Sequence, residues 1–140
     1  MKFYPRLKVF KNSTDRNVFD GTKATSYGWY TYAYVFEKDG KQETYMVEKS
    51  YSPTTNQHMG EFLNLLGFPE TKEILAPAGL SNLGSALRAI RSEILKLEGE
   101  LKNPRRKKDK RLKRIETLQA QIILVKELQE RLRQKEELAA

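Results

Sequence analysis

The 140-residue sequence contains no cysteine and only one histidine. The absence of cysteine excludes a disulfide scaffold and any thiolate metal site, and it is typical of proteins from a reducing cytoplasm. A single imidazole provides no pair for zinc, so we predict neither a metal site nor a cofactor. Apolar runs stay well short of the roughly 18 residues of a membrane span, and the first residues lack the pattern of a signal peptide. We therefore expect a soluble cytoplasmic protein.

Catalytic motifs are missing as well. The sequence has no G-x-S-x-G, no phosphate-binding loop and no paired-glycine nucleotide fingerprint. The carboxylates in its expected turns and strands show no telling spacing. We interpret His58 as a structural residue near a helix start, with contact to a ligand phosphate as the alternative. We predict that the protein is not an enzyme.

Positive charge is concentrated in residues 102–114, which we call the basic segment. It holds nine cations and one anion, and the rest of the chain carries 17 charges of each sign, so the net charge of +8 belongs to this segment. The cations are Lys102, Arg105, Arg106, Lys107, Lys108, Lys110, Arg111, Lys113 and Arg114. A neutral protein with one basic region predicts a local contact with a polyanion, the alternative being a solvated stretch that aids solubility.

The first third of the sequence has the composition of an antiparallel β-sheet. Aromatic and β-branched residues at 26–37 predict a strand, and we place it centrally because both of its faces are apolar. The pair Asp39-Gly40 predicts a hairpin turn into a partner strand at 42–49. We also expect an edge strand at 3–10 and a loop at 12–23.

A short helix is expected next. Ser52 with Pro53 predicts its start, Thr55 is the alternative N-cap, and Gly67 predicts its end. Residues 68–79 are expected to form a connector with at most one helical turn. We therefore divide the chain into a β-rich domain with a short helix, residues 1–79, and a helical domain, residues 80–140.

Heptad spacing marks the rest of the chain. Leu and Ile residues recur at alternating spacings of three and four from Leu80 to Leu101. A second series of Leu, Ile and Val runs at spacings of three or four from Leu112 to Leu132, and Gln129 is its one polar member. Folded back antiparallel, the two series match rung by rung. The predicted fold class is α+β: a small antiparallel β domain with one short helix, followed by a long antiparallel helical hairpin that forms a coiled coil. The basic segment would be its protruding tip.

The second predicted helix has more apolar residues than one seam needs. Ile123, Leu124 and Leu128 lie off the seam, where they would either dock on the β domain or meet another chain. We favour contact between copies, and so expect a homo-oligomer, most simply a dimer.

The aromatic run between Tyr27 and Phe36 has two interpretations. We predict that it is mainly core, with one Tyr-lined face contributing to a binding groove as the alternative, because exposed aromatic rings stack bases. An alternative nucleotide pocket between subunits would combine aromatic, imidazole and guanidinium groups. Its candidate residues are Trp29, Tyr32, His58, Arg88 and Arg91.

The segment Tyr51-Ser52-Pro53-Thr54-Thr55-Asn56-Gln57-His58, followed by an apolar helix, resembles a Tyr-Ser-x-Thr-Thr-x-x-His pattern found in small proteins of phages and plasmids. The resemblance implies an accessory protein of a mobile element inside a bacterial host cell, with no defined activity. The expected outline is also similar to that of a phage protein family that sequesters cyclic ADP-ribose immune signals, in shape alone.

These observations favour a non-enzymatic accessory protein that binds RNA, DNA or a host complex containing nucleic acid through the basic segment. The alternative is a phage anti-defence protein. It would inhibit a host defence protein, in the manner of an anti-CRISPR, or sequester a cyclic nucleotide signal in a pocket between subunits.

Overall fold

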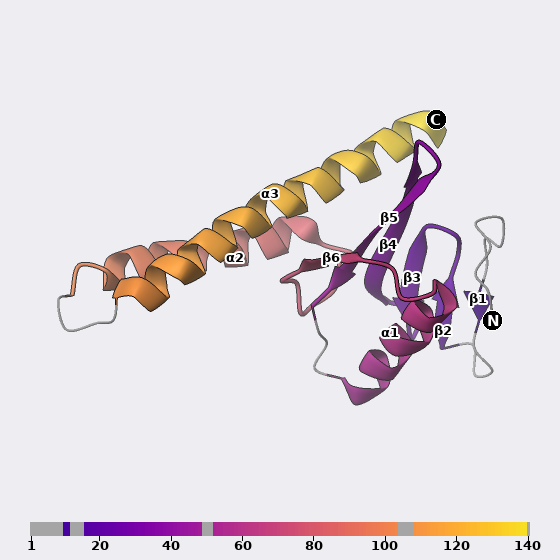
Figure 1. The fold of residues 1–140 in the computed structure, drawn as a ribbon, viewed down its shortest axis with the longest axis horizontal. Helices are drawn as coiled ribbons and strands as arrows, with labels where there is room; N and C mark the ends of the chain where they lie inside the picture. The colour runs from indigo at the N-terminus through magenta and orange to yellow at the C-terminus, as the bar shows by residue number, and fades with distance from the viewer. Residues whose placement is uncertain (1–9, 12–15, 49–51, 104–107, 140) are drawn as a thin grey trace. The chain divides into compact units, whose positions relative to one another are not determined.

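The computed structural model describes residues 10–11, 16–48, 52–103 and 108–139. The chain divides into two compact units, Met1–Ser81 and Asn82–Ala140. The first unit is built on a β-sheet and the second consists of helices (Figure 1).

The sheet has six strands whose order in space equals their order in the chain. They are β1 (Phe10–Lys11), β2 (Asn17–Phe19), β3 (Lys23–Ser26), β4 (Tyr30–Lys38), β5 (Lys41–Val47) and β6 (Thr71–Ile74). Neighbours from β1 to β5 pair antiparallel, whereas β6 pairs parallel to β5. The helix α1 (Pro53–Leu65) lies between these two strands in the chain, as parallel neighbours require a crossover.

The predicted antiparallel β domain is therefore wrong, because the sheet is mixed. The expected connector at 68–79 contains β6, and Ile74 in that strand is fully buried. Pairing with β6 gives the backbone of β5 partners along an edge that would otherwise lack them. The strand–helix–strand alternation of residues 41–74 was the signal for this parallel pair.

Two boundaries near the start of the sheet also differ from the prediction. The expected loop at 12–23 contains β2, and the expected strand at 26–37 is interrupted by a turn between β3 and β4. Tyr27 and Gly28 in this turn have φ of 57° and 78°, a left-handed conformation that glycine adopts without steric cost. Of the expected edge strand at 3–10, only Phe10 lies within the described residues.

Other local predictions are confirmed. β4 is an interior strand of the sheet, and Asp39 and Gly40 form the turn to β5 with φ of 53° and 77°. Ser52 is the N-cap of α1, with Pro53 in its first turn. Gly67 follows the end of α1 with φ of 76°, and its N–H donates to the Asn64 carbonyl at 3.1 Å.

The core of the first unit joins α1 to the sheet. Phe62 of α1 is fully buried, and its ring meets those of Phe19 and Tyr32 edge-on, at centroid distances of 5.3 and 5.5 Å. Edge-to-face contacts of this kind add to the free energy gained by burying the rings. Because Phe19 is in β2 and Tyr32 is in β4, one side chain of α1 holds two strands.

The second unit contains α2 (Leu83–Glu100) and α3 (Lys108–Ala139), which pack against each other. α2 has 18 residues and α3 has 32, so α3 is a long C-terminal helix with no partner of equal length among the described residues. Within the described residues the two helices do not form the evenly paired antiparallel hairpin that we predicted, and the predicted coiled coil is wrong as well.

Burial along α3 shows why the heptad prediction failed. Ile115, Leu118 and Val125 are buried as predicted, but Leu112 at one end of the expected seam is 47% exposed. Further along, Leu128 is fully buried in place of Gln129. Burying an apolar side chain is favourable, whereas a buried amide without partners costs free energy, so the helix turns Leu128 inward.

Candidate functional site

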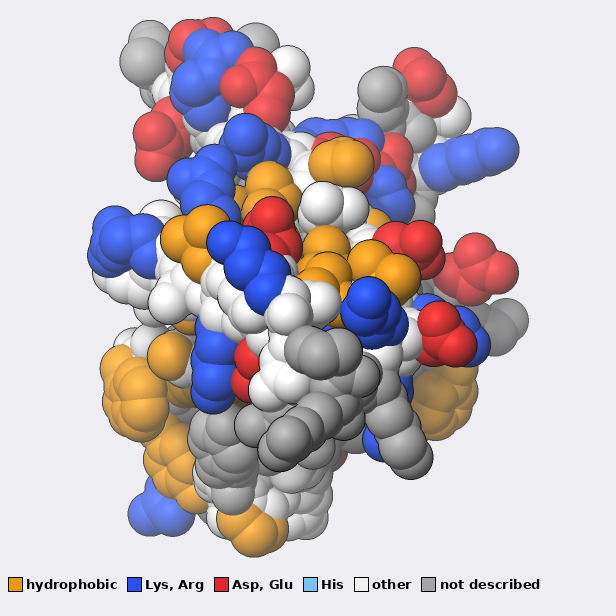
Figure 2. All heavy atoms as spheres, turned by 90° about the vertical axis from the view of Figure 1, so that its left-hand side faces the viewer, with side chains coloured by type: hydrophobic (Ala, Val, Ile, Leu, Met, Phe, Trp, Pro, Cys, Tyr) orange, Lys and Arg blue, Asp and Glu red, His pale blue; other side chains and the backbone are white. Residues whose placement is uncertain are grey.

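The described part of the basic segment presents lysines to solvent. Lys102 follows the end of α2, and Lys108, Lys110 and Lys113 are exposed around the start of α3. The last three line a shallow hollow of about 480 Å³ together with Asp109. Figure 2 faces this end of the unit and shows Lys and Arg side chains at the surface. Three further predicted residues, Arg105, Arg106 and Lys107, lie outside the described residues.

The two arginines of α3 in the segment are engaged within the unit. Arg111 Nε donates to Glu100 Oε2 at 2.9 Å, and Arg114 contacts both oxygens of Glu93, with its Nε 3.0 Å from Oε1. Both carboxylates belong to α2. These ion pairs join α2 to α3 and leave the exposed lysines as the unneutralised charge: Lys102, Lys108, Lys110 and Lys113 have no ion pair with any described residue.

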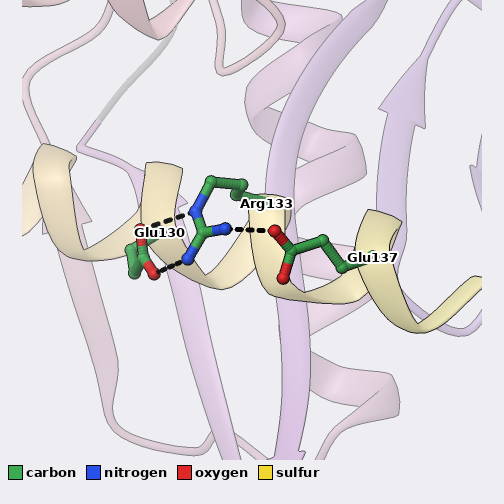
Figure 3. A network of polar contacts seen from close by, with 3 residues as sticks. All are labelled: Glu130, Arg133 and Glu137. Carbon is green, nitrogen blue, oxygen red and sulfur yellow. Dashed lines mark hydrogen bonds and ion pairs between the residues drawn. The ribbon is translucent and has the colours of Figure 1, made fainter.

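Near the C-terminal end of α3, oppositely charged side chains pair with one another. Arg133 lies between Glu130 and Glu137 and hydrogen-bonds to both (Figure 3). The hydrogen bonds from Arg133 lower the pKa of Glu130 below its ordinary value. Charges one turn apart on a helix commonly pair in this way. The start of α3 differs from its end, because Lys108, Lys110 and Lys113 form no such ion pair with the described residues.

The Tyr-Ser-x-Thr-Thr-x-x-His segment builds a buried polar network in the first unit. Its first residue, Tyr51, lies outside the described residues, and Ser52 accepts a hydrogen bond from the Thr55 N–H at 3.3 Å. Ser26 Oγ of β3 lies 2.7 Å from His58 Nδ1 and 3.1 Å from Thr55 Oγ1. Residues 52, 55 and 58 are three apart in the sequence and therefore lie on one face at the start of α1. On this face Thr55 contacts the N-cap Ser52, and both Thr55 and His58 contact Ser26 of β3.

A second layer of the network involves Asn17 of β2. Its Nδ2 donates to the His58 carbonyl at 3.0 Å, and its Oδ1 accepts from the Tyr32 hydroxyl at 2.7 Å. Asn17, Ser26 and Tyr32 are fully buried. Because every one of these polar groups has a partner, the network holds α1 on the sheet without leaving an unpaired polar atom among them.

This network is structural. The contact between Ser26 and His58 has the elements of a nucleophile and a base, but the side chain of Ser26 is fully buried. The Tyr27 ring lies over His58, with 5.6 Å between the ring centroids. A substrate would have no access to Ser26, so we assign the motif to the attachment of α1 rather than to chemistry.

Tyr32 should make the first unit less stable at alkaline pH. Burial raises its pKa well above the ordinary value of about 10, and the hydrogen bond to Asn17 offsets only part of this shift. Above about pH 10 the unfolded chain loses this proton while the folded chain keeps it, so the free energy of unfolding falls as pH rises. We expect Tyr32→Phe to reduce this fall, measured by urea unfolding at several pH values. An unchanged pH dependence would contradict the assignment.

An aromatic cleft of about 330 Å³ lies beside this network. Tyr27 and Trp29 of the β3–β4 turn and Tyr30, the first residue of β4, form one part of its wall. Ser52 and Thr55 at the start of α1 form another, with Pro77 and Ala78 completing it. Trp29 is 70% exposed, and the Tyr30 hydroxyl donates to the Pro77 carbonyl at 2.8 Å, which fixes the ring of Tyr30.

The predicted nucleotide pocket is not assembled in the first unit. Trp29 lines the cleft, but Tyr32 and His58 are buried in the polar network. Arg88 and Arg91 are exposed residues of α2, in the second unit. The expectation that the aromatic run is mainly core holds for Tyr30, Tyr32 and Phe36, whereas Tyr27 and Trp29 are exposed.

The residues predicted at an oligomer interface fall into different environments. Ile123 is 71% exposed and Leu124 is partly exposed, so both are accessible to a second copy. Leu128 is fully buried within the chain, because it belongs to the inward face of α3. Of the three predicted interface residues, Leu128 is thus the one without exposed surface for a second copy.

Several residues of these sites were missed from the sequence. Asn17 and Ser26 looked like loop and strand residues, and only the folded sheet brings them to His58. The cleft had a signal in Gly28, since a glycine inside a strand pattern marks a turn and therefore exposure of its neighbours.

Comparisons with family models, with curated proteins and with solved structures find no match to this chain. No helix among the described residues is both long and apolar enough to cross a membrane. The same part of the chain contains no group of three or more His, Cys, Asp or Glu side chains placed to hold a metal ion.

Proposed function

We propose that this protein is a non-enzymatic nucleic-acid-binding protein whose basic segment contacts the phosphate backbone. The observation that carries the proposal is the set of exposed lysines around the start of α3, which have no ion pair with the described residues. Elsewhere in the sequence positive and negative charges balance. The electrostatic attraction of a polyanion to this protein would therefore be strongest at the basic segment.

The position of these lysines adds support. Asp109 is the only acidic residue in the first turn of α3, where Lys108 and Lys110 also lie. Cations at a helix N-terminus oppose the helix dipole, at about 0.3–1 kcal/mol each when exposed. A local cost to stability, in a chain that pairs its charges at the other end of the same helix, favours a role outside the fold.

The expected mode of binding follows from the chemistry of lysine. Its ammonium group is a point charge on a flexible stem and lacks the rigid fork of donors that a planar guanidinium presents. Arg111 and Arg114 have this planar group, but both are held by carboxylates of α2. The proposed contact is therefore largely independent of sequence and sensitive to salt.

The test is the triple variant Lys108→Gln, Lys110→Gln, Lys113→Gln, with binding to labelled DNA and RNA measured by fluorescence anisotropy over a range of salt concentrations. We expect weaker binding and a shallower salt dependence, by about 0.7–0.9 in the slope of log K against log salt for each phosphate that the variant no longer neutralises. The fold should persist, since these side chains are exposed.

The matched control is Lys41→Gln, Lys96→Gln, Lys126→Gln, which removes the same charge from exposed positions outside the segment. It should leave most of the affinity and the slope intact. If the two triple variants weaken binding equally, the segment contributes only through the overall charge of the protein and the proposal is wrong. Failure of the wild-type chain to bind would also overturn the proposal.

A further inference from the structure

We infer that the aromatic cleft of the first unit stacks an unpaired nucleobase, so that the nucleic acid bound by this protein is single-stranded where it meets the cleft. This inference rests on the proposed function and goes beyond it. It assigns a second contact surface, of different chemistry from the basic segment and on a different unit of the chain.

The geometry of Trp29 is the first support. Its indole is 70% exposed although it lines the cleft, and its ring plane makes an angle of 79° with that of Tyr30. The two rings therefore do not stack on each other, and a planar ligand has access to the indole. The Tyr30 ring is held by its hydroxyl, through the hydrogen bond to the Pro77 carbonyl. Such a wall is largely preformed, which favours binding.

The backbone of the turn is the second support. Tyr27 has a backbone φ of 57°, a value that residues other than glycine rarely adopt. The conformation is held by a hydrogen bond from the Tyr27 N–H to the Arg16 carbonyl, at 2.7 Å. Backbone strain that the surrounding structure maintains is concentrated at functional sites. Here it places two aromatic side chains, Tyr27 and Trp29, at the surface.

The charge around the cleft fits a phosphodiester ligand. None of the described residues that line it is acidic. The Arg16 guanidinium lies 6.0 Å from the centroid of the ring of Tyr27, which lines the cleft. Ser52 and Thr55 belong to the start of α1, whose first turn has no acidic residue. An anionic ligand with a flat, apolar base therefore matches the cleft in shape and sign.

An unpaired base is the form that such a wall can bind. In a duplex both faces of each base are covered by its neighbours, whereas a base in a single strand has a face free for an aromatic side chain. Stacking on aromatic residues is tolerant of sequence because every base has such a face. The cleft and the basic segment thus agree in expecting little sequence preference.

The experiment uses the only tryptophan of the sequence as its reporter. The full-length protein is titrated with short unlabelled oligonucleotides of deoxythymidine or uridine, and Trp29 fluorescence is followed. We expect quenching by the single strands and little quenching by a duplex of the same length. In a parallel anisotropy measurement, Trp29→Ala should weaken single-strand binding by about 5- to 150-fold.

Two variants make the result specific. Trp29→Phe retains a ring and should keep the affinity within a few-fold of the wild type. Phe68→Ala removes another aromatic side chain of the first unit, one that is 69% exposed and does not line the cleft, and it should have no effect. Trp29→Ala should also leave the salt dependence unchanged, because it removes no charge.

The two proposals fail in different ways. If Trp29→Ala binds as the wild type does and the oligonucleotides do not quench, the cleft inference is wrong while the basic segment stands. If the lysine variants of the segment bind as the wild type does but quenching persists, the cleft stands alone. Quenching by a proline-rich peptide, with none by oligonucleotides, would overturn the inference and assign the cleft to a protein partner.

Discussion

Phe62→Ala is expected to lower the free energy of unfolding of the first unit by about 3–5 kcal/mol, the range for a large buried aromatic side chain. Phe62 is fully buried and meets Phe19 and Tyr32 edge-on, so its removal leaves a cavity between α1 and two strands. Urea unfolding followed by Trp29 fluorescence measures the change, because the only tryptophan lies in this unit.

The control for this variant is Phe68→Ala. Phe68 follows the end of α1 and is 69% exposed, so removing its ring should change stability by about 0.5 kcal/mol or less. Equal destabilisation by the two variants would mean that α1 does not pack on the sheet through Phe62.

Leu118→Ala is expected to lower the stability of the second unit by about 2–5 kcal/mol. Leu118 is fully buried, whereas Leu112 is 47% exposed, although the heptad pattern treats both as seam positions. Leu112→Ala should therefore cost much less than Leu118→Ala. Thermal unfolding followed by far-ultraviolet circular dichroism reports on these helices, and equal costs would favour the heptad pattern over the structure.

Local signals predicted the turns and helix ends well. The conformations of Asp39-Gly40 and Gly67 and the capping by Ser52 are determined by a few neighbouring residues, and each was found as expected. Such features depend on backbone sterics and on hydrogen bonds that need no distant partner.

Features that depend on distant residues were predicted poorly. The short strand β2 looked like a loop because Asn17 is polar, yet Asn17 is buried through hydrogen bonds to α1 and Tyr32. The parallel position of β6 depends on where α1 returns the chain. On α3, the choice between Leu128 and Gln129 depends on what each side chain meets, which spacing alone does not contain.

In the candidate sites too, what depends on nearby residues was predicted and what depends on distant residues was not. The excess of charge in residues 102–114 is plain in the sequence, but the engagement of Arg111 and Arg114 by carboxylates of α2 is not. His58 was interpreted as structural, and it is buried in contact with Ser26, a partner that the sequence did not identify. The cleft was missed because the aromatic run was taken as one continuous strand, and the turn at Tyr27 and Gly28 exposes part of it.

The parallel pairing of β6 with β5 has a consequence for the order in which the first unit assembles. β2 to β5 meet their neighbours across short connections, whereas β6 meets β5 only after the chain has passed through α1. Closing this longer loop costs more entropy, so contacts made across it form late. The contacts of Thr55 and His58 with Ser26 also close long loops, because they join residues 29 and 32 apart in the sequence. Thr55 also lines the aromatic cleft, so the cleft is complete only when contacts of this long-range kind have formed.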